Sequence, residues 1–141
     1  MKNKTIQKLI LSVKKEIDNL LVTKSMLEEK MICEQKHLNE LKQSFKMELE
    51  LATQQIIYGF NSAEFIKNEL IKQHEKELDI STLNREISTV LEEIVNKNIN
   101  KKTYEHILEQ IITDDNIKEA KAEMELIDTY SLISFNKTQD V

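Results

Sequence analysis

Helix-breaking residues are almost absent from this chain, and this constrains its fold more than any other feature. The 141 residues contain no proline and a single glycine, Gly59. Proline removes a backbone donor and clashes with the preceding helical turn, and glycine costs a helix interior about 1 kcal/mol in backbone entropy. Because Gly59 stands between two long helix-forming stretches, the sequence predicts two long helices joined by one turn.

The first stretch carries an apolar stripe with the spacing of a coiled coil. Steps of four and three residues alternate from Ile6 to Ala52, and eleven of the fourteen stripe positions are apolar. A repeat that averages about 3.5 residues keeps a narrow stripe facing one partner helix. The first helix is therefore expected to pack lengthwise on another helix. The stripe positions are Ile6, Ile10, Val13, Ile17, Leu20, Lys24, Leu27, Met31, Glu34, Leu38, Leu41, Phe45, Glu48 and Ala52.

The turn is indicated by local chemistry. Gly59 can adopt the left-handed conformation that ends many helices. Asn61 can cap the free amide of Glu64, whose carboxylate can reach back to the cap. The predicted bounds are 3–57 for the first helix, 58–61 for the turn and 62–134 for the second helix, with a frayed tail at 135–141. So short a turn requires antiparallel helices, whose facing residue numbers sum to about 120, and beyond about position 120 the second helix has no partner in the first.

The second stretch has a looser stripe, in which six of the fourteen positions are polar. Its predicted positions are Ile66, Leu70, Gln73, Glu77, Ile80, Asn84, Ile87, Leu91, Ile94, Asn98, Lys101, Glu105, Leu108 and Ile112. Polar residues on a stripe either fix the register at a cost in stability or leave the hairpin able to twist against a partner. The polar positions weighed in this way are Lys24, Glu34, Glu48, Asn84 and Asn98. The asparagine-rich segment 96–102 is the weakest helix former and a candidate soft point.

The predicted fold is all-α, a long antiparallel two-helix coiled-coil hairpin that forms a single domain over residues 1–141. Without tryptophan, and with 5% aromatic residues, the chain cannot fill a large core. One glycine cannot supply a glycine-rich phosphate loop. We therefore expect a protein that is not an enzyme, uses no cofactor and does not hydrolyse ATP by itself.

Other classes of function are also disfavoured. The apolar runs are far shorter than the roughly twenty residues of a membrane span, and no signal peptide is evident, so a cytoplasmic protein with one free thiol, Cys33, is expected. One arginine and a pI of about 5.3 disfavour nucleic-acid binding. Cys33 and His37 have the spacing of metal ligands, but no third ligand is expected to converge on them, so no metal site is predicted.

Charge is distributed unevenly along the chain. Residues 103–141 carry nine acids and three lysines, whereas residues 1–15 carry no acid. In one interpretation the basic segment balances Glu105, Glu109, Asp114, Asp115 and Glu119 of the antiparallel helix. In the other, its lysines bind an acidic protein ring or an anionic membrane surface. The five lysines of the basic segment are Lys2, Lys4, Lys8, Lys14 and Lys15.

With this architecture, the chain resembles the FliJ family of flagellar type III export proteins, which is similar to the SctO/YscO stalk proteins of virulence secretion systems. The resemblance covers most of the length. It rests on the hairpin, on the small-residue cap Asn61-Ser62-Ala63-Glu64 followed by Phe65-Ile66, and on a late aromatic-acid-leucine pattern. That pattern reads Lys102-Thr103-Tyr104-Glu105-His106-Ile107-Leu108-Glu109, and an acid-rich segment that ends at Asp128 follows it.

The resemblance implies a non-catalytic central stalk that links a hexameric export ATPase to a membrane export gate protein, with export chaperones as further partners. It implies a cytoplasmic location, peripheral at the inner face of the cell membrane. Candidate gate contacts are Phe45, Phe65 and Leu49, which stands where the family usually has an aromatic residue. The candidate ATPase contacts are Tyr104, Leu108 and the five lysines of the basic segment.

Two other functions stay open from the sequence. The hairpin could be a holding chaperone or adaptor that binds an amphipathic helix of a client along exposed stripe positions. It could also be a homodimeric coiled-coil spacer. A stalk should activate a ring ATPase, a chaperone should bind clients stoichiometrically, and a spacer should self-associate.

Overall fold

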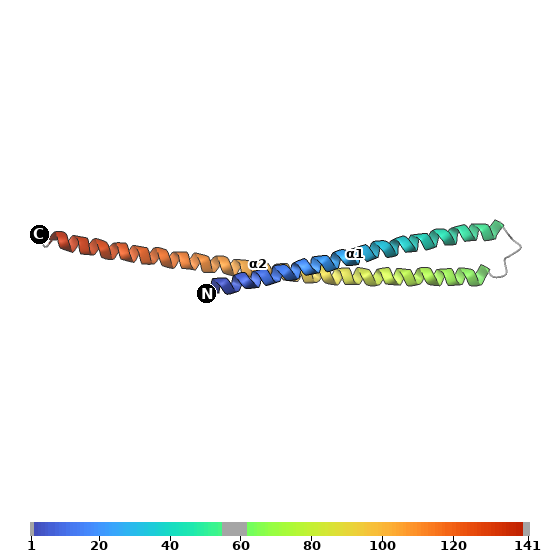
Figure 1. Cartoon of the computed structure of the whole chain (residues 1–141), viewed down its shortest axis with the longest axis horizontal. Helices are drawn as coiled ribbons and strands as arrows, with labels where there is room; N and C mark the ends of the chain where they lie inside the picture. Colours follow the sequence, from blue (N-terminus) through green and yellow to red (C-terminus); the bar gives the residue numbers. More distant parts are fainter. Residues whose placement is uncertain (1, 55–61, 140–141) are drawn as a thin grey trace. The chain divides into compact units, whose positions relative to one another are not determined.

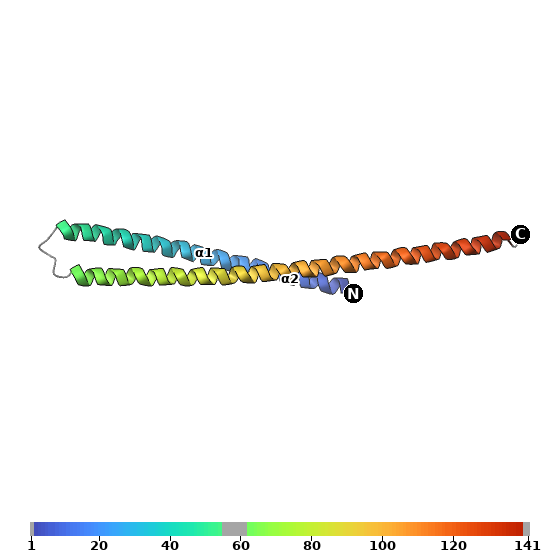
Figure 2. The ribbon, with the colours of Figure 1, turned by 180° about the vertical axis from the view of Figure 1, so that it is seen from behind.

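The structure, a computed structural model, is entirely helical over the residues that it describes, 2–54 and 62–139. Helix α1 spans Lys2–Gln54 and helix α2 spans Ser62–Gln139 (Figure 1). The two helices run antiparallel and pack against each other, as the reverse view also shows (Figure 2). The predicted all-α helical hairpin is confirmed.

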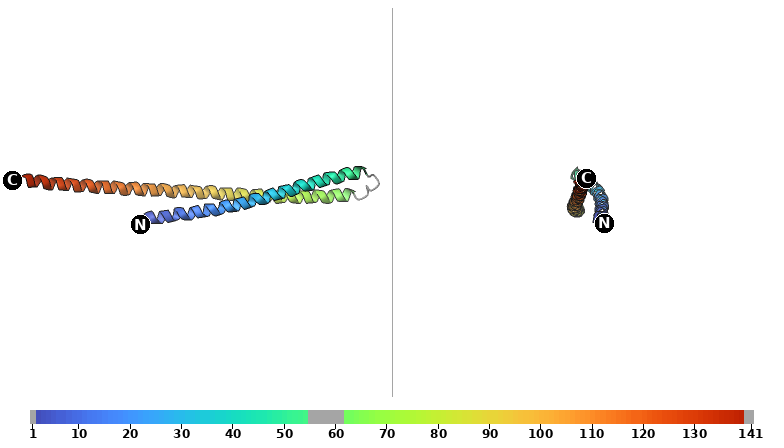
Figure 3. Two further views of the ribbon diagram at one scale, coloured as in Figure 1. Left: turned by 45° about the horizontal axis from the view of Figure 1, so that its top comes forward. Right: turned by 90° about the vertical axis from the view of Figure 1, so that its left-hand side faces the viewer.

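The chain divides into two compact units, each with a segment of both helices. Unit 1 comprises Met1–Glu16 and Lys97–Val141, and unit 2 comprises Ile17–Asn96. In each unit a part of α1 lies beside a part of α2 (Figure 3). Both helices continue without interruption through the division, which in α2 falls where the asparagine-rich segment begins. The single domain and the softness of that segment stay predictions.

The length of α2 agrees with the absence of proline and glycine from its sequence. Helix α2 begins at Ser62, where the capping pattern placed it, and continues to Gln139 through residues that were expected to belong to a frayed tail. Nothing in residues 135–139 breaks a helix, and Lys137 in the last turn favours the negative end of the helix dipole. The predicted turn, with Gly59, lies outside the described residues.

The stripe predicted for α1 is the buried face of this helix as far as Phe45. Every stripe position from Ile6 to Phe45 is buried or half-buried, and Ile10, Val13, Ile17 and Leu38 are the most enclosed. The prediction then fails by one residue, because Glu48 is exposed and Leu49 is half-buried. A four-residue step from Phe45 to Leu49 places an apolar side chain, and not a carboxylate, on the packed face.

The stripe predicted for α2 is right at every second position and wrong at most of the others. Residues 66, 73, 80, 87, 94, 101 and 108 are buried or half-buried, as predicted. Between them the packed positions are 69, 76, 83, 90, 97, 104 and 111, each three residues after its predecessor, whereas Leu70, Leu91 and Ile112 are exposed. The predicted stripe took a four-residue step at these places, which selected Leu70 in place of Glu69 and Asn84 in place of Leu83, whereas the packing against α1 follows the three-residue step.

The polar residues of the stripes are therefore partly different from those predicted. Lys24, Glu34 and Asn98 are half-buried as expected, but Glu48 and Asn84 are exposed. The packed face of α2 also contains Gln73 and Lys101, which the predicted stripe included, and Glu69, Lys76 and Lys97, which it did not. Of these, Gln73 is the one polar residue among the described ones that is classed with the buried core, at 9% exposure.

The register of the hairpin also differs from the prediction. The Glu34 carboxylate accepts a 2.6 Å hydrogen bond from the Lys76 ammonium group, whereas the predicted register places position 86 opposite Glu34. Phe45 stacks on Phe65, although position 75 was expected there. The helices are therefore shifted by about one heptad or slightly more. The prediction was centred on a turn at 58–61, which lies outside the described residues, whereas these contacts fix the register from the helices themselves.

Two further ion pairs fit this register when the reach of lysine is considered. In unit 1, Lys97 and Glu16 are joined at 2.6 Å. In unit 2, Lys42 and Glu77 are 3.9 Å apart, close to the predicted register, and this pair is the longest of those between the two helices. A lysine side chain can span about one helical turn, so the long exposed pair is compatible with the register that the shorter contacts set.

Candidate functional site

The aromatic residues predicted to contact a gate lie together in unit 2. The rings of Phe45 and Phe65 are stacked, with centroids 6.4 Å apart and planes inclined by 26°. Both are half-buried, as is Leu49 one turn further along α1. Such aromatic pairs contribute about 0.5–1.5 kcal/mol beyond area burial. The pair thus helps to hold α1 and α2 together.

The basic segment of α1 lies in unit 1 and is open to solvent. All five of its lysines are exposed, and among the ion pairs between described residues none includes any of the five. Lys2 shares an open groove with Ile6, Ile107 and Ile111. Because Lys2 is near the start of α1 and lies by Ile111, the part of α2 that is paired with α1 ends close to Ile111. Asp114, which was expected to lie beside the lysines, comes after this paired part.

This register removes most of the intramolecular charge balance that was weighed from the sequence. The acids Asp114, Asp115 and Glu119 come after Ile111, where the packed face of α2 ends. Glu105 and Glu109 remain within the paired length, but the ion pair of Glu105 is with Lys101 on the same helix, at 3.9 Å. The basic segment and the acidic part of α2 are thus largely separate surfaces of one unit.

The predicted contacts Tyr104 and Leu108 have a different environment. Both are half-buried on the face of α2 that packs against α1. Their side chains therefore take part in the hairpin, and only their outer edges are available to a partner. The structure brings them near the basic segment in unit 1, but it does not present them as a free surface.

The most exposed apolar surface lies on the last part of α2, residues 112–139, which we call the arm. Figure 1 shows α2 continuing past the first residues of α1. Every described side chain from 112 to 137 is exposed. Its large apolar residues are Ile112, Ile117, Met124, Leu126, Ile127, Tyr130, Leu132, Ile133 and Phe135. None of these was named as a binding residue from the sequence, although the expected overhang of the second helix was the signal that could have selected them.

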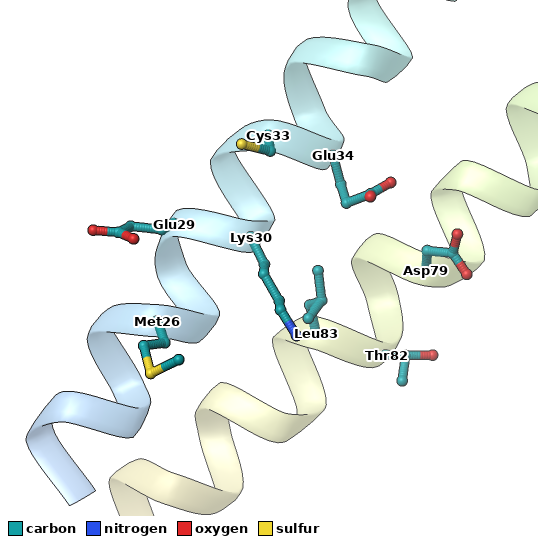
Figure 4. Close-up of a pocket in the computed structure, with 8 residues that line it drawn as sticks. All are labelled: Met26, Glu29, Lys30, Cys33, Glu34, Asp79, Thr82 and Leu83. Carbon is teal, nitrogen blue, oxygen red and sulfur yellow. The ribbon is translucent and has the colours of Figure 1, made fainter. Parts of the chain in front are cut away.

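One groove of unit 2 is open and shallow, with a volume of about 670 Å³. Residues from both helices line it: Met26, Glu29, Lys30, Cys33, Glu34, Asp79, Thr82 and Leu83 (Figure 4). Lys30 and Glu34 extend from α1 toward α2, whereas Glu29 points away from it. Cys33 is an exposed free thiol. The groove can accept a side chain or part of a helix, but its walls do not enclose a small substrate.

One ion pair in this region shifts the pKa of both its members. The Lys76 ammonium group donates its hydrogen bond to Glu34, and this bond is the main reason that the pKa of Glu34 is lowered. The same bond with Glu34 raises the pKa of Lys76. The side chains are each 28% exposed, so solvent screens the pair. The shifts have their main cause in this charge contact between the two helices.

Metal and membrane binding were also considered over the part of the chain that the structure describes. Within 2–54 and 62–139, no three or more histidine, cysteine, aspartate or glutamate side chains are grouped as metal ligands, so Cys33 and His37 gain no third ligand. Over the same residues, neither helix contains a stretch that is both long and apolar enough to cross a membrane.

No family model, no curated protein and no solved structure matches this chain.

Proposed function

We propose that this chain is a non-catalytic coupling protein of a flagellar type III export system, which binds a hexameric export ATPase and a membrane export gate protein. The observation that carries the proposal is the helical hairpin, whose polar and apolar groups line open surfaces along two helices. Such a surface suits binding to other proteins along its length better than it suits enclosing a substrate. The resemblance to the FliJ family supplies the partners.

In this proposal the two units have different partners. In unit 1, the exposed lysines of α1 and the acidic, apolar arm bind the ATPase ring. In unit 2, Phe45, Phe65 and Leu49 contact the gate protein. Export chaperones are further candidate partners, and the protein works in the cytoplasm at the inner face of the cell membrane without a cofactor.

The test uses the full chain with the export ATPase of the same source. The chain alone should show no ATP turnover, and adding it should raise the ATPase rate at a ratio of one chain per ring. Replacing the five lysines of the basic segment with glutamine should weaken this activation much more than it lowers helical content, because clustered charge steers association. A chain that neither binds nor activates the ring would contradict the proposal.

A second function, a holding chaperone or adaptor, is favoured by one observation. The arm exposes large apolar side chains on all sides, for example Leu126 at 71% and Tyr130 at 72%. Helices with this pattern are usually covered by a partner. A chaperone should bind a client's amphipathic helix stoichiometrically and leave ATPase rates unchanged, so the same assay separates the two functions.

A further inference from the structure

Unit 1 contains a basic face on α1 that points away from the packed stripe. Lys4, Lys8, Leu11 and Lys15 follow one another at steps of four, three and four residues, which places them on one face of the helix. All four are exposed, and Leu11 is 58% exposed. The opposite face of the same segment holds the buried stripe residues. The basic face is therefore a surface with a leucine at its centre and lysines around it.

The arm carries a face with the same spacing and the opposite charge. Glu119, Glu123, Leu126 and Tyr130 also follow one another at steps of four, three and four residues, and all are exposed. Read from the amino end of each helix, glutamate stands where the basic face has its first two lysines. Leucine then matches leucine, and a tyrosine matches the last lysine. The two faces are complementary position by position when the helices are parallel.

These two faces do not meet within one chain. Lys2 shares its groove with Ile107 and Ile111, and α1 runs antiparallel to α2. Lys4 therefore lies beside earlier residues of α2 and not beside Glu119. The basic face also points away from the packed stripe. A contact between the two faces requires a second copy of the chain.

We propose that the arm of one chain binds the basic face of α1 in a second copy, in a reciprocal dimer with two-fold symmetry. Glu119, Glu123, Leu126 and Tyr130 then lie against Lys4, Lys8, Leu11 and Lys15 of the other copy. The symmetry gives the required direction. If the α2 helices of the two copies are antiparallel, each arm is parallel to the other copy's α1, and equal heptad positions lie opposite each other.

Charge selects this arrangement over a dimer of two arms. The arm carries six acids and three lysines, so two arms would bring like charges together, which opposes association. The first fifteen residues carry five lysines and no acid. The two α1 segments also occupy different parts of α2, since the chain's own Lys2 lies near Ile111 and the second copy's Lys4 lies near Glu119. Each copy can therefore keep its own hairpin in the dimer.

The dimer does not depend on the proposed coupling function, because its tests contain no ATPase. It uses the arm and some of the lysines that are proposed to bind the ring. Self-association therefore withholds this surface until a partner competes for it. Ring binding should accordingly be measured at concentrations where the chain is monomeric, so that failure of one proposal is not read as failure of the other.

The deciding experiment mixes two charge-reversed full-length chains and measures mass by sedimentation equilibrium. One chain carries Lys4→Glu and Lys8→Glu, and the other carries Glu119→Lys and Glu123→Lys. Alone, each variant opposes like charges at both contacts, and its dimer dissociation constant should rise about 100-fold or more. In an equimolar mixture one contact is native and the other is fully reversed, so dimers should return. Circular dichroism confirms that each variant remains helical.

The matched control is Glu125→Lys with Asp128→Lys, which changes the charge of the arm by the same amount outside the proposed face. Its dissociation constant should rise less than about fivefold, because it alters no direct contact. Higher salt should weaken the wild-type dimer. A wild-type chain that stays monomeric at low salt overturns the proposal. So does a dimer that is insensitive to the lysine reversals, which would indicate arm–arm pairing, and so does a mixture that stays monomeric.

Discussion

Residues 62–111 and the arm belong to the same helix, but they are helical for different reasons. In the first segment, at least two positions in every heptad are buried or half-buried, and Gln73 and Ile94 are the most enclosed. In the arm every described side chain is exposed. Packing of an amphipathic face stabilises the first segment, whereas the arm depends on local helix propensity alone in a single chain.

The comparison shows what a helix-forming pattern does and does not establish. The arm has the residues of a good helix, including Ala120, Ala122 and the acid-before-lysine pair Asp114 and Lys118 four residues apart. It lacks a partner helix within its own chain. Most of the stability of helices in proteins comes from tertiary packing of one face, and the arm has no such packing in a single chain. The arm is therefore the part of the molecule whose order should depend most on binding.

The first prediction tests the register between α1 and α2, which decides where the arm begins. A crosslink should form at one position of α2 and not at the control position. Cys33 and Asp79 line the same groove of unit 2 from opposite helices. The variant Asp79→Cys should therefore be joined to Cys33 within one chain by a short bis-maleimide. Mass spectrometry of the digested product identifies the linked peptides, and the monomer band on a denaturing gel shows that the link is intramolecular.

Glu86→Cys is the matched control, one heptad further along the same exposed face of α2. It stands close to the position opposite Cys33 in the register inferred from the sequence alone. A link at position 86 and none at position 79 would restore that register, and α1 would then cover part of the arm. Links between chains alone would argue against the hairpin.

The sequence was sufficient for the fold class because one glycine and a heptad stripe leave few alternatives. It predicted the α1 stripe from Ile6 to Phe45, where alternating steps of four and three residues meet an apolar residue at all positions except Lys24 and Glu34. It failed on α2, where two adjacent residues compete for one stripe position, as Glu69 and Leu70 do. Only the partner helix decides between them, because burial depends on the heptad step and not on hydrophobicity alone.

The candidate binding residues were less predictable than the fold. The pairing of Phe45 with Phe65 depends on the register, which the length of the turn sets and local sequence does not encode. The same error placed Asp114 beside the lysines of α1. Conversely, the exposure of Leu126 and Tyr130 follows once the overhang of α2 is known. A shift of about one heptad between the two helices thus separates the lysines of the basic segment from most of the acids that were expected to balance them. The basic segment and the arm are left as two exposed surfaces.

The second prediction compares one buried side chain with one on the arm. Ile94 is 8% exposed, and Ile94→Ala should lower the free energy of unfolding by about 2–4 kcal/mol through lost burial and a cavity. Ile127 is 62% exposed, and Ile127→Ala should change it by less than about 0.5 kcal/mol. Urea titration followed by circular dichroism, at a concentration where the chain is monomeric, measures both. Similar losses at the two positions would show that the arm is packed in the single chain.

The third prediction concerns a polar side chain within the packed region. Gln73 is buried, and its Nε2 group donates to no partner among the described residues. Gln73→Leu should raise the free energy of unfolding by about 1–2 kcal/mol, because it removes an unsatisfied donor and adds apolar burial. The control Gln110→Leu, at an exposed position of unit 1, should have little effect. A loss of stability in Gln73→Leu would show that the amide has a partner that holds the register.

The smallest expected effect is the pH dependence of the Glu34–Lys76 pair. The hydrogen bond from Lys76 lowers the pKa of Glu34, so its stabilisation is complete above the ordinary glutamate pKa and is lost as pH falls through the lowered value. The stabilisation that accompanies the raised pKa of Lys76 is complete below the ordinary lysine pKa and is lost as pH rises through the raised value.

Glu34→Gln should therefore destabilise the hairpin at neutral pH, and the difference from wild type should shrink in strong acid. Glu77→Gln, which removes the longer 3.9 Å pair with Lys42, should cost less at neutral pH. If the two variants show equal losses in urea titrations from acidic to neutral pH, the short bond contributes no more than the long exposed pair, and the packed region would owe its stability to its apolar stripe alone.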